Sequence, residues 1–271
     1  MTSSLMDQTA HWSVVAHQWS LLGPPLRPSE ADLDGFRRGM GGFEKPRVAL
    51  FGATMELYRL PWPEGTHWAI VDNNVDILNA VWAGPRDMAI RADWRSLPLA
   101  PSSRDLVMCD GGLTLVPYPV GYESIVDCLW KTLASGGAAL FRVHIRPSLP
   151  ESHDAVLDDL LAARIPSLNH LKIRLGTALQ TSTREGVVLD AIWNALHRVA
   201  PDLRELAERL GWDFERLQVI EDYRDNPYRF RFPELFEIQD VFEHRGFRME
   251  WANYPDYVMG ERSPVLCFRR P

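Results

Sequence analysis

The chain has 271 residues, 46% of them hydrophobic, and a formal net charge of −7 at pH 7. A chain of this length and apolar content can fold into one α/β domain with an added lobe around a well-buried core. The acidic balance argues against nucleic acid as a partner, because affinity for a phosphate backbone comes from clustered Lys and Arg side chains.

Cysteine content and apolar runs bear on the cellular compartment. The three cysteines, Cys109, Cys128 and Cys267, lie far apart and form no CxxC pair, so neither a metal site nor a disulfide framework is expected. Residues 1–10 are polar and lack the basic start and apolar core of a signal peptide, and no later apolar run is long enough to span a bilayer. We therefore expect a cytoplasmic protein without a membrane partner.

Between residues 47 and 145, short apolar strands alternate with helical segments, which is the pattern of a parallel sheet built from βαβ units. The expected strands are 47–51, 67–71, 87–92, 105–109 and 138–143, and the expected helices are 55–59, 73–82 and 121–133. The Ser135-Gly136-Gly137 segment is interpreted as the stop of the last of these helices.

The chain after residue 145 departs from this rhythm. Helical periodicity at 154–164, 189–198 and 203–209 indicates an inserted helical lobe, and a helix near 233–244 precedes two strands at 247–251 and 264–269. Two adjacent closing strands suggest an antiparallel hairpin at the edge of the sheet. The expected fold is α/β: a doubly wound, seven-stranded, mostly parallel sheet with a C-terminal antiparallel strand and a helical insertion after the fifth strand.

These patterns divide the chain into four segments. Residues 1–46 form an N-terminal helix and an arm, and residues 20–46 are rich in Gly and Pro, which favours an ordered arm over a helix. Residues 47–145 form the core, residues 146–233 the helical insertion, and residues 234–271 the final helix and the closing hairpin.

Ligands of open α/β sheets bind at the carboxyl ends of the strands, where this sequence places Gly52, Asp72, Asp93 and Asp110. Gly52 lets the backbone turn sharply and lets a ligand approach closely. Asp72 lies twenty residues further on, a spacing at which a carboxylate accepts hydrogen bonds from both hydroxyls of a ribose. A turn glycine and a helix-capping aspartate are the structural alternative for this pair.

With these residues in place, the chain resembles the class I methyltransferases that use S-adenosylmethionine (SAM), over residues 47–145 and again over 247–269. The glycine-rich first loop of that family is present as Leu50-Phe51-Gly52-Ala53-Thr54-Met55-Glu56, with only its first glycine and without its leading acid. The resemblance implies that Gly52 faces the methionine part of SAM, that Asp72 holds the ribose hydroxyls, and that Asp93 with Trp94 borders the adenine. Asp110 then faces the methionine and the reacting methyl group, and strand 264–269 matches the antiparallel strand that closes the family's sheet.

Other loop residues complete the expected cofactor site. Glu56 replaces the missing acid as a partner of the SAM ammonium, or it is a favourable acid in the first turn of a helix. Thr54 caps the same helix or touches the SAM carboxylate. The expected cofactor contacts are Gly52, Ala53, Thr54, Glu56, Asp72, Asn73, Asp93, Trp94, Asp110 and Gly111, and no metal is expected.

Methyl transfer from a sulfonium is an in-line displacement, so alignment of the acceptor supplies much of the rate and a dedicated base is optional. If the acceptor is a hydroxyl or a protonated amine, a base within hydrogen-bond reach helps the reaction. Asp110, Tyr118 and His144, near the ends of the fourth and fifth strands, are the catalytic candidates. His144 has the most suitable intrinsic pKa, and a structural role at the strand end is its alternative.

Two further segments are expected around the site. Trp12 and Trp19, seven residues apart on an N-terminal helix, fold with His17 over the SAM site as a lid, or pack on the outside of the domain. The insertion is where the resembled family usually places acceptor selectivity, and its aromatic, Arg and Gln side chains either bind a planar or anionic acceptor or form a homodimer interface. They are Arg174, Gln180, Tyr223, Arg224, Tyr228 and Arg229.

The expected function is transfer of a methyl group from SAM to an O or N atom of a small molecule. No Asn-Pro-Pro-Tyr motif follows the fourth strand, where Asp110-Gly111-Gly112-Leu113 stands, which disfavours the DNA and glutamine methyltransferases. A Rossmann oxidoreductase would share Gly52 and Asp72, but its GxGxxG fingerprint and a Tyr-x-x-x-Lys pair are absent from the sequence. A noncatalytic interaction protein on the same scaffold is the remaining alternative.

Overall fold

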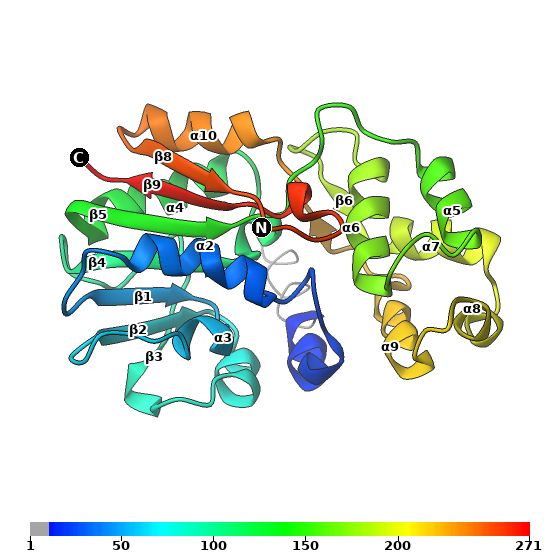
Figure 1. The fold of residues 1–271 in the computed structure, drawn as a ribbon, viewed down its shortest axis with the longest axis horizontal. Helices are drawn as coiled ribbons and strands as arrows, with labels where there is room; N and C mark the ends of the chain where they lie inside the picture. Colours follow the sequence, from blue (N-terminus) through cyan, green and yellow to red (C-terminus); the bar gives the residue numbers. More distant parts are fainter. Residues whose placement is uncertain (1–10) are drawn as a thin grey trace.

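Seven strands form one sheet in the computed structural model, which describes residues 11–271 (Figure 1). The strand order is β3-β2-β1-β4-β5-β9-β8, in which β1 to β5 run parallel and β9 pairs antiparallel with both β5 and β8. The strands are β1 (Arg47–Phe51), β2 (His67–Asp72), β3 (Ala89–Arg91), β4 (Arg104–Asp110), β5 (Leu133–Arg142), β8 (Arg248–Asn253) and β9 (Val265–Arg269). The predicted doubly wound sheet with an antiparallel closing strand is confirmed. The polar segment 1–10, in which the sequence predicts no signal peptide, lies outside the described residues.

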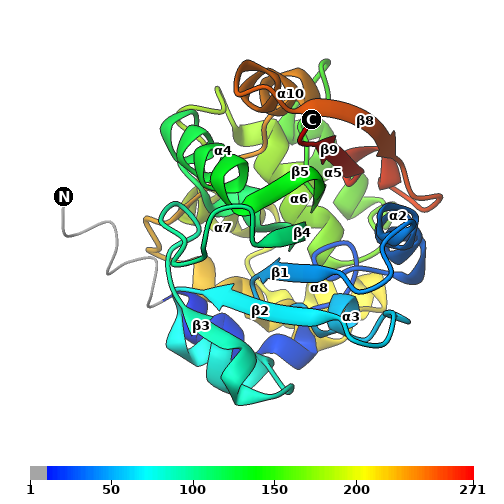
Figure 2. The same ribbon diagram turned by 90° about the vertical axis from the view of Figure 1, so that its left-hand side faces the viewer.

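Alternating side chains of the central strand β1 explain why helices cover both faces of the sheet. Val48 and Leu50 join the core that includes residues of α2 (Glu30–Met40) and α3 (Met55–Tyr58). Ala49 and Phe51 face the other way, toward α4 (Val120–Thr132) and α10 (Leu235–His244). Figure 2 shows the sheet between these two helical layers. A parallel strand that is buried on both faces is apolar throughout, which is why β1 is recognisable in the sequence.

Two local interpretations within the core are wrong. The third strand is confined to Ala89–Arg91, because Arg86–Met88 form a 3-10 helix, η3. The Ser135-Gly136-Gly137 segment is no helix stop, because α4 already ends at Thr132 and β5 begins at Leu133. Gly136 donates a backbone hydrogen bond of 2.8 Å to the carbonyl of Arg270, and Arg270 donates one of 2.9 Å to Gly137, so these glycines extend the pairing of β5 with β9. The helix expected after Asp72 is present and consists mostly of a π-helix, η2 (Ile77–Val81).

The expectation that residues 20–46 lack a helix is also wrong, since α2 occupies Glu30–Met40. A capping box starts it: the Ser29 hydroxyl accepts from the backbone N–H of Asp32, and the Asp32 carboxylate accepts from that of Ser29. The glycines of α2 allow close packing and do not end the helix. A Cβ atom on Gly35 would lie 2.7 Å from the Cβ of Val265 in β9.

The predicted insertion is a lobe of helices with its own apolar core, beside the sheet domain in Figure 1. The expected helices at 154–164, 189–198 and 203–209 are confirmed as α5 (His153–Leu161), α7 (Leu189–Val199) and α8 (Leu203–Leu210). The sequence did not predict α6 (Leu168–Leu179), although Leu171 and Leu175 of this helix are fully buried. The remaining elements are α9 (Phe214–Gln218), η5 (Val219–Tyr223) and the short pair β6 (Val187–Val188) and β7 (Arg229–Phe230).

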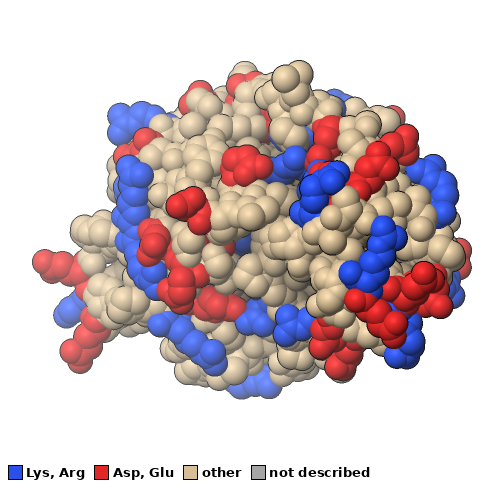
Figure 3. Space-filling model, turned by 45° about the vertical axis from the view of Figure 1, so that its right-hand side comes forward, with Lys and Arg blue, Asp and Glu red and all other residues tan. Residues whose placement is uncertain are grey.

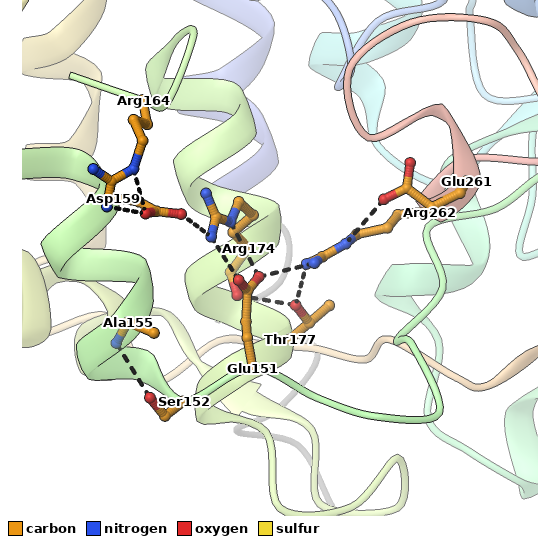
Figure 4. Close-up of polar contacts among 9 residues, drawn as sticks. All are labelled: Glu151, Ser152, Ala155, Asp159, Arg164, Arg174, Thr177, Glu261 and Arg262. Atoms are coloured by element: carbon orange, nitrogen blue, oxygen red, sulfur yellow. Dashed lines mark hydrogen bonds and ion pairs between the residues drawn. The ribbon is translucent and has the colours of Figure 1, made fainter. Parts of the chain in front are cut away.

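An ion-pair network joins this lobe to the sheet domain (Figure 4). Glu151, in the segment that leads from β5 to α5, pairs with Arg174 of α6 at 2.5 Å and with Arg262 of η6 (Gly260–Arg262) at 2.9 Å. Arg174 also contacts Asp159 of α5 at 2.6 Å. Two arginines therefore share Glu151, and they hold the pKa of its carboxyl below the usual value although partial burial acts to raise it.

A fully buried guanidinium ties α2 to the strand ends. The side chain of Arg142, at the end of β5, is 0% exposed and pairs with Asp110 at the end of β4 and, at 3.5 Å, with Asp32 of α2. It also donates a hydrogen bond of 2.8 Å to the carbonyl oxygen of Pro25. Burial acts to lower the pKa of Arg142, but the two carboxylates outweigh it and hold that pKa above its usual value. One cation thus links β4, β5, α2 and the arm before α2.

The surface carries both signs of charge. On the face seen in Figure 3, acidic and basic side chains are interspersed over the sheet domain and the lobe. None of the helices in the described part of the chain is long and apolar enough to cross a membrane.

Replacement of Gly35 by Ala tests the close packing of α2 on β9. We expect Gly35→Ala to lower the free energy of unfolding by about 1–3 kcal/mol, because the added methyl overlaps the stiff Val265 side chain in a packed core. Denaturation in urea measures the change. Gly41→Ala is the matched control, since a Cβ there would lie 3.5 Å from its nearest neighbour, the Arg38 carbonyl oxygen. Equal stability of the two variants would contradict this packing.

Replacement of Arg142 tests the buried ion pairs. We expect Arg142→Met to lower the free energy of unfolding by about 3–5 kcal/mol, because it leaves two buried carboxylates without a counter-charge. The control Arg37→Met removes an exposed guanidinium that pairs with Glu30 and Asp34 on α2, and it should change stability little. Denaturation of both variants followed by tryptophan fluorescence gives the comparison, and an Arg142→Met protein as stable as Arg37→Met would refute the role of the pair.

Candidate functional site

A cavity of about 210 Å³ lies where the carboxyl ends of the parallel strands face the helical lobe. Its first wall is made of the residues that directly follow β1, β2, β3, β4 and β5. Its second wall comes from α6, η5, β7 and the helical residues 11–17. Strand ends of this kind are the usual ligand site of open α/β sheets, so the cavity is the candidate functional site.

The structure brings most of the sequence-predicted site residues into the first wall. The predicted residues found in this wall are Gly52, Ala53, Thr54, Asp72, Asn73, Asp93, Trp94, Asp110, Gly111 and His144. Glu56 and Tyr118 are not part of this lining.

The backbone conformation at Gly52 favours glycine. Its φ of +86° lies in the left-handed region, which other residues seldom adopt. A Cβ atom placed on Gly52 would lie 4.0 Å from the Oδ2 atom of Asp72 and 4.0 Å from the ring of Trp94. The backbone therefore leaves an open cradle between this carboxylate and this ring.

Asp72 presents a buried carboxyl group at the end of β2. Its Oδ1 accepts a 2.7 Å hydrogen bond from the backbone N–H of Asn74. Burial raises the pKa of Asp72 to about 7, against the opposing effect of the backbone N–H groups of Asn74 and Asn73. The group can therefore change its charge near neutral pH.

Asp93 and Trp94 follow β3 and have fixed orientations. The Asp93 carboxylate pairs with Arg95 at 2.5 Å, and the hydrogen bonds of Arg95 lower the pKa of Asp93 although burial acts to raise it. The Trp94 ring stacks on Phe51 with 5.5 Å between centroids and 6° between planes, and its Nε1 donates a 2.7 Å hydrogen bond to the carbonyl of Val71. Trp94 is thus a rigid flat wall of the cradle.

Thr54 and Glu56 belong to the shortened first loop. Thr54 occupies the N-cap position of α3, as one alternative predicted, but its side chain makes no capping hydrogen bond, and the buried residue lies in the cavity wall. Glu56 pairs with Arg27 of the N-terminal arm through its Oε1 atom. The Glu56 carboxylate therefore binds the arm and does not line the cavity.

Of the three catalytic candidates, Asp110 and His144 reach the cavity. The Asp110 carboxylate is engaged by Arg142, and burial raises its pKa although Arg142 opposes the rise. Nδ1 of His144 lies 3.1 Å from the Ser263 hydroxyl, and burial together with the charge of Arg142 lowers the pKa of His144 to about 3. Tyr118 packs edge-on against Tyr122, with ring centroids 5.3 Å apart, and lies outside the cavity.

The second wall contains only part of the expected acceptor-binding set. Tyr223 and Tyr228 line the cavity. Arg174, Gln180, Arg224 and Arg229 do not line it, because each is engaged elsewhere: with Glu151, with the backbone of Phe232, with Glu221 and with the carbonyl of Glu185.

Lys172 and Asp222 are cavity residues that the sequence reasoning missed. The available signal is the helical spacing of Lys172, four residues after Leu168 and three before Leu175, which places it on the buried side of α6. A lysine on the buried face of a helix is rare and requires a specific partner or role.

The N-terminal residues 11–21 close the cavity opposite the strands. Trp12 and Trp19, as well as His11, lie in its lining. The His11 ring stacks on Tyr228 with 5.4 Å between centroids and 24° between planes. His17 is exposed and binds the carbonyl of Ser13, so it does not belong to this closure. No group of three or more His, Cys, Asp or Glu side chains placed to hold a metal ion is found among residues 11–271.

Comparisons with known proteins give no match to a protein-family model and none to a curated sequence. Solved structures do match. A protein from Rhodobacter sphaeroides, provisionally named a zinc-dependent alcohol dehydrogenase, is 16% identical over 98% of this chain and 98% of its own, with a TM-score of 0.63.

Methyltransferases of the same fold match over nearly the whole chain. One from Thermotoga maritima, suggested to be a histamine N-methyltransferase, is 12% identical over 97% of this chain and 99% of its own, with a TM-score of 0.52. One from Aquifex aeolicus is 10% identical over 96% of this chain and 98% of its own, with a TM-score of 0.51. At such identities the likeness concerns the fold, and this chain has the fold of the class I SAM-dependent methyltransferases.

Proposed function

We propose that the protein is a SAM-dependent methyltransferase that transfers a methyl group to an O or N atom of a small molecule. The observation that carries the proposal is the cradle at Gly52, bordered by the buried carboxyl of Asp72 and the flat ring of Trp94. It occupies the strand ends of a sheet whose fold is that of the SAM-dependent methyltransferases.

The residues around the cradle suit the parts of SAM. An ionised Asp72 accepts hydrogen bonds from both ribose hydroxyls. Trp94 offers its face to the adenine, with Asp93 beside it, and the backbone at Gly52, Ala53 and Thr54 leaves room for the methionine part. Asn73 and Gly111 complete this set.

SAM supplies a methyl group that is already activated for displacement, so the protein has to hold and align the acceptor and exclude water. Asp110 is engaged by Arg142, and His144 with a pKa of about 3 is neutral and only weakly basic at neutral pH. We infer that both orient the reacting groups at the strand ends, and that alignment contributes more to the rate than proton abstraction does. Tyr118 lies outside the cavity and takes no part in this proposal.

Binding of S-adenosylhomocysteine by Asp72→Asn tests the cofactor site. We expect affinity about 10–100-fold below that of the wild type, because a hydrogen-bond partner with a full charge is lost. Asp87→Asn, which removes an exposed carboxylate outside the cavity, is the control and should bind normally. Isothermal titration calorimetry measures both variants.

The pH dependence of the same titrations gives a second readout. With a pKa of about 7, Asp72 is mostly ionised at pH 8 and mostly protonated at pH 6. Since only the ionised form accepts from both hydroxyls, affinity should fall about tenfold between pH 8 and pH 6, and Asp72→Asn should remove this dependence. Binding of NAD in place of S-adenosylhomocysteine would favour the oxidoreductase alternative, and binding of neither would favour a noncatalytic protein.

We further propose that residues 11–21 act as a lid on the cofactor. The Trp19 side chain lines the cavity, whereas Trp62 packs against Trp68 outside it. Trp19→Ala should weaken S-adenosylhomocysteine binding by about tenfold or more through the loss of buried apolar contact, whereas Trp62→Ala should bind as the wild type does. Equal affinities of the two variants in calorimetric titration would reject the lid.

A further inference from the structure

The end of the cavity away from the strands has a chemistry of its own. It is formed by Lys172 of α6, Asp222 and Tyr223 of η5, Tyr228 and the N-terminal His11. None of these residues belongs to the strand ends at which the cofactor is proposed to bind.

Lys172 places a buried ammonium group at this end. The residue is 4% exposed and lines the cavity. Its Nζ lies 4.5 Å from the centre of the Tyr223 ring, a cation–π contact. Within residues 11–271 its ammonium forms no ion pair or hydrogen bond, in contrast to Arg174, Arg224 and Arg229 of the lobe, which bind acids or a carbonyl group.

The surroundings do not neutralise this cation. Burial lowers the pKa of Lys172 to about 8, and the opposing effect of Asp222 is too weak to restore it. The Lys172 charge also affects His11, because burial and then this charge lower the pKa of His11 to about 4. An ammonium in an apolar cavity is stabilised when an anion contacts it. Asp222 acts on Lys172 through its charge but forms no ion pair with it among residues 11–271, so this contact is left for a ligand.

The walls beside Lys172 are aromatic and set at an angle to one another. Tyr228 and Phe230 meet edge to face, with ring centroids 5.8 Å apart and planes at 90°. Tyr223 and Phe230 meet in the same way at 6.1 Å and 82°. Rings in such a frame present both faces and edges to a flat ligand. The Thr114 hydroxyl, also in the cavity wall, has no hydrogen-bond partner among the described residues and is free for a polar substituent.

We propose that the acceptor is an aromatic carboxylate with a hydroxyl or amino substituent, whose carboxylate binds the Lys172 ammonium while its ring packs among Tyr223, Tyr228 and Phe230. This inference rests on the proposed function, because the substituent has to reach the strand ends to be methylated. An acceptor with an amino group in place of the carboxylate is disfavoured, because its ammonium would meet the like charge of Lys172.

Three ligands of the same shape and different charge test the proposal. They are 4-hydroxybenzoate, 4-hydroxybenzamide and 4-hydroxybenzylamine, titrated calorimetrically at millimolar concentrations into the full chain saturated with S-adenosylhomocysteine. We expect the acid to bind at least about tenfold more tightly than the neutral amide, and the amine to bind most weakly. The aminobenzoate analogue, 4-aminobenzoate, should bind as the hydroxybenzoate does.

Variants of Lys172 connect this preference to one side chain. Lys172→Met should bind acid and amide equally, and Lys172→Arg should keep the preference for the acid. Lys131→Met removes an exposed lysine at the end of α4 and should behave as the wild type. Unchanged S-adenosylhomocysteine affinity in Lys172→Met shows that the variant is folded and that its cofactor site is intact.

The pH profile provides a readout that a purely structural lysine would not change. The groups that face Lys172 are Asp222 and Tyr223 of η5 and His11 of the N-terminal helix. Because the Lys172 cation is lost above its pKa of about 8, affinity for the acid should fall from pH 7 to pH 9. At pH 8 the acid should bind with uptake of protons, seen as a dependence of the binding enthalpy on the buffer, and Lys172→Met should abolish both effects.

The outcomes separate this inference from the proposed function. A wild-type protein that does not bind S-adenosylhomocysteine overturns the proposed function and the inference with it. A protein that binds S-adenosylhomocysteine but neither acid, or that binds the amide or the amine as tightly as the acid, overturns the inference alone. A Lys172→Met variant that still binds the acid more tightly than the amide also overturns the inference alone.

Discussion

The buried guanidinium of Arg142 is the interaction on which the site depends, because four parts of the chain meet at it. It joins Asp110 of β4 to Asp32 of α2, and it binds the carbonyl of Pro25 in the arm. The hydroxyl of Tyr257, in the segment before β9, donates a 2.8 Å hydrogen bond to the same Asp32. Two acids and one base leave a formal charge of −1 beneath the strand ends when both carboxyls are ionised. A negative charge at this place suits the sulfonium and ammonium groups of the proposed cofactor.

The two ends of the cavity carry different charged groups. The carboxyl groups of Asp72 and Asp110 lie at the strand end, where Arg95 is paired with Asp93, whereas the Lys172 ammonium lies at the lobe end near Asp222. Charges that line a cavity are screened less than charges at the surface, so the Lys172 ammonium favours an anionic ligand group and the strand-end carboxylates favour a cationic one. A cationic cofactor and an anionic acceptor would thus be directed to opposite ends, which also brings the reacting atoms together between them.

The sequence predicts the sheet far better than it predicts the second wall of the cavity. Buried parallel strands are continuous apolar runs, so β1, β2 and β4 and the acids that end β2 and β4 could be located from pattern alone. The sequence did not predict α2, because glycines are typical of loops. The structure shows that Gly35 is small because Val265 packs directly against it. For a related reason, the sequence predicted Arg174 as a cavity residue and did not predict Lys172. Which basic side chain of α6 faces the cavity depends on how this helix packs, and the local sequence does not encode that packing.

The loss of glycines from the first loop has a counterpart in the packing around it. Ala53 and Met55 are buried in the core under α2, so only Gly52, with its positive φ, has to be glycine. Glu56, which follows Met55, pairs with Arg27. The Arg27 guanidinium lies 5.5 Å from the ring of Trp19, which lines the cavity. Arg27 thus connects the first loop to the N-terminal segment that contains Trp19. In the proposed lid, opening of the N-terminal arm would separate the Arg27–Glu56 pair, which couples the first loop to the arm.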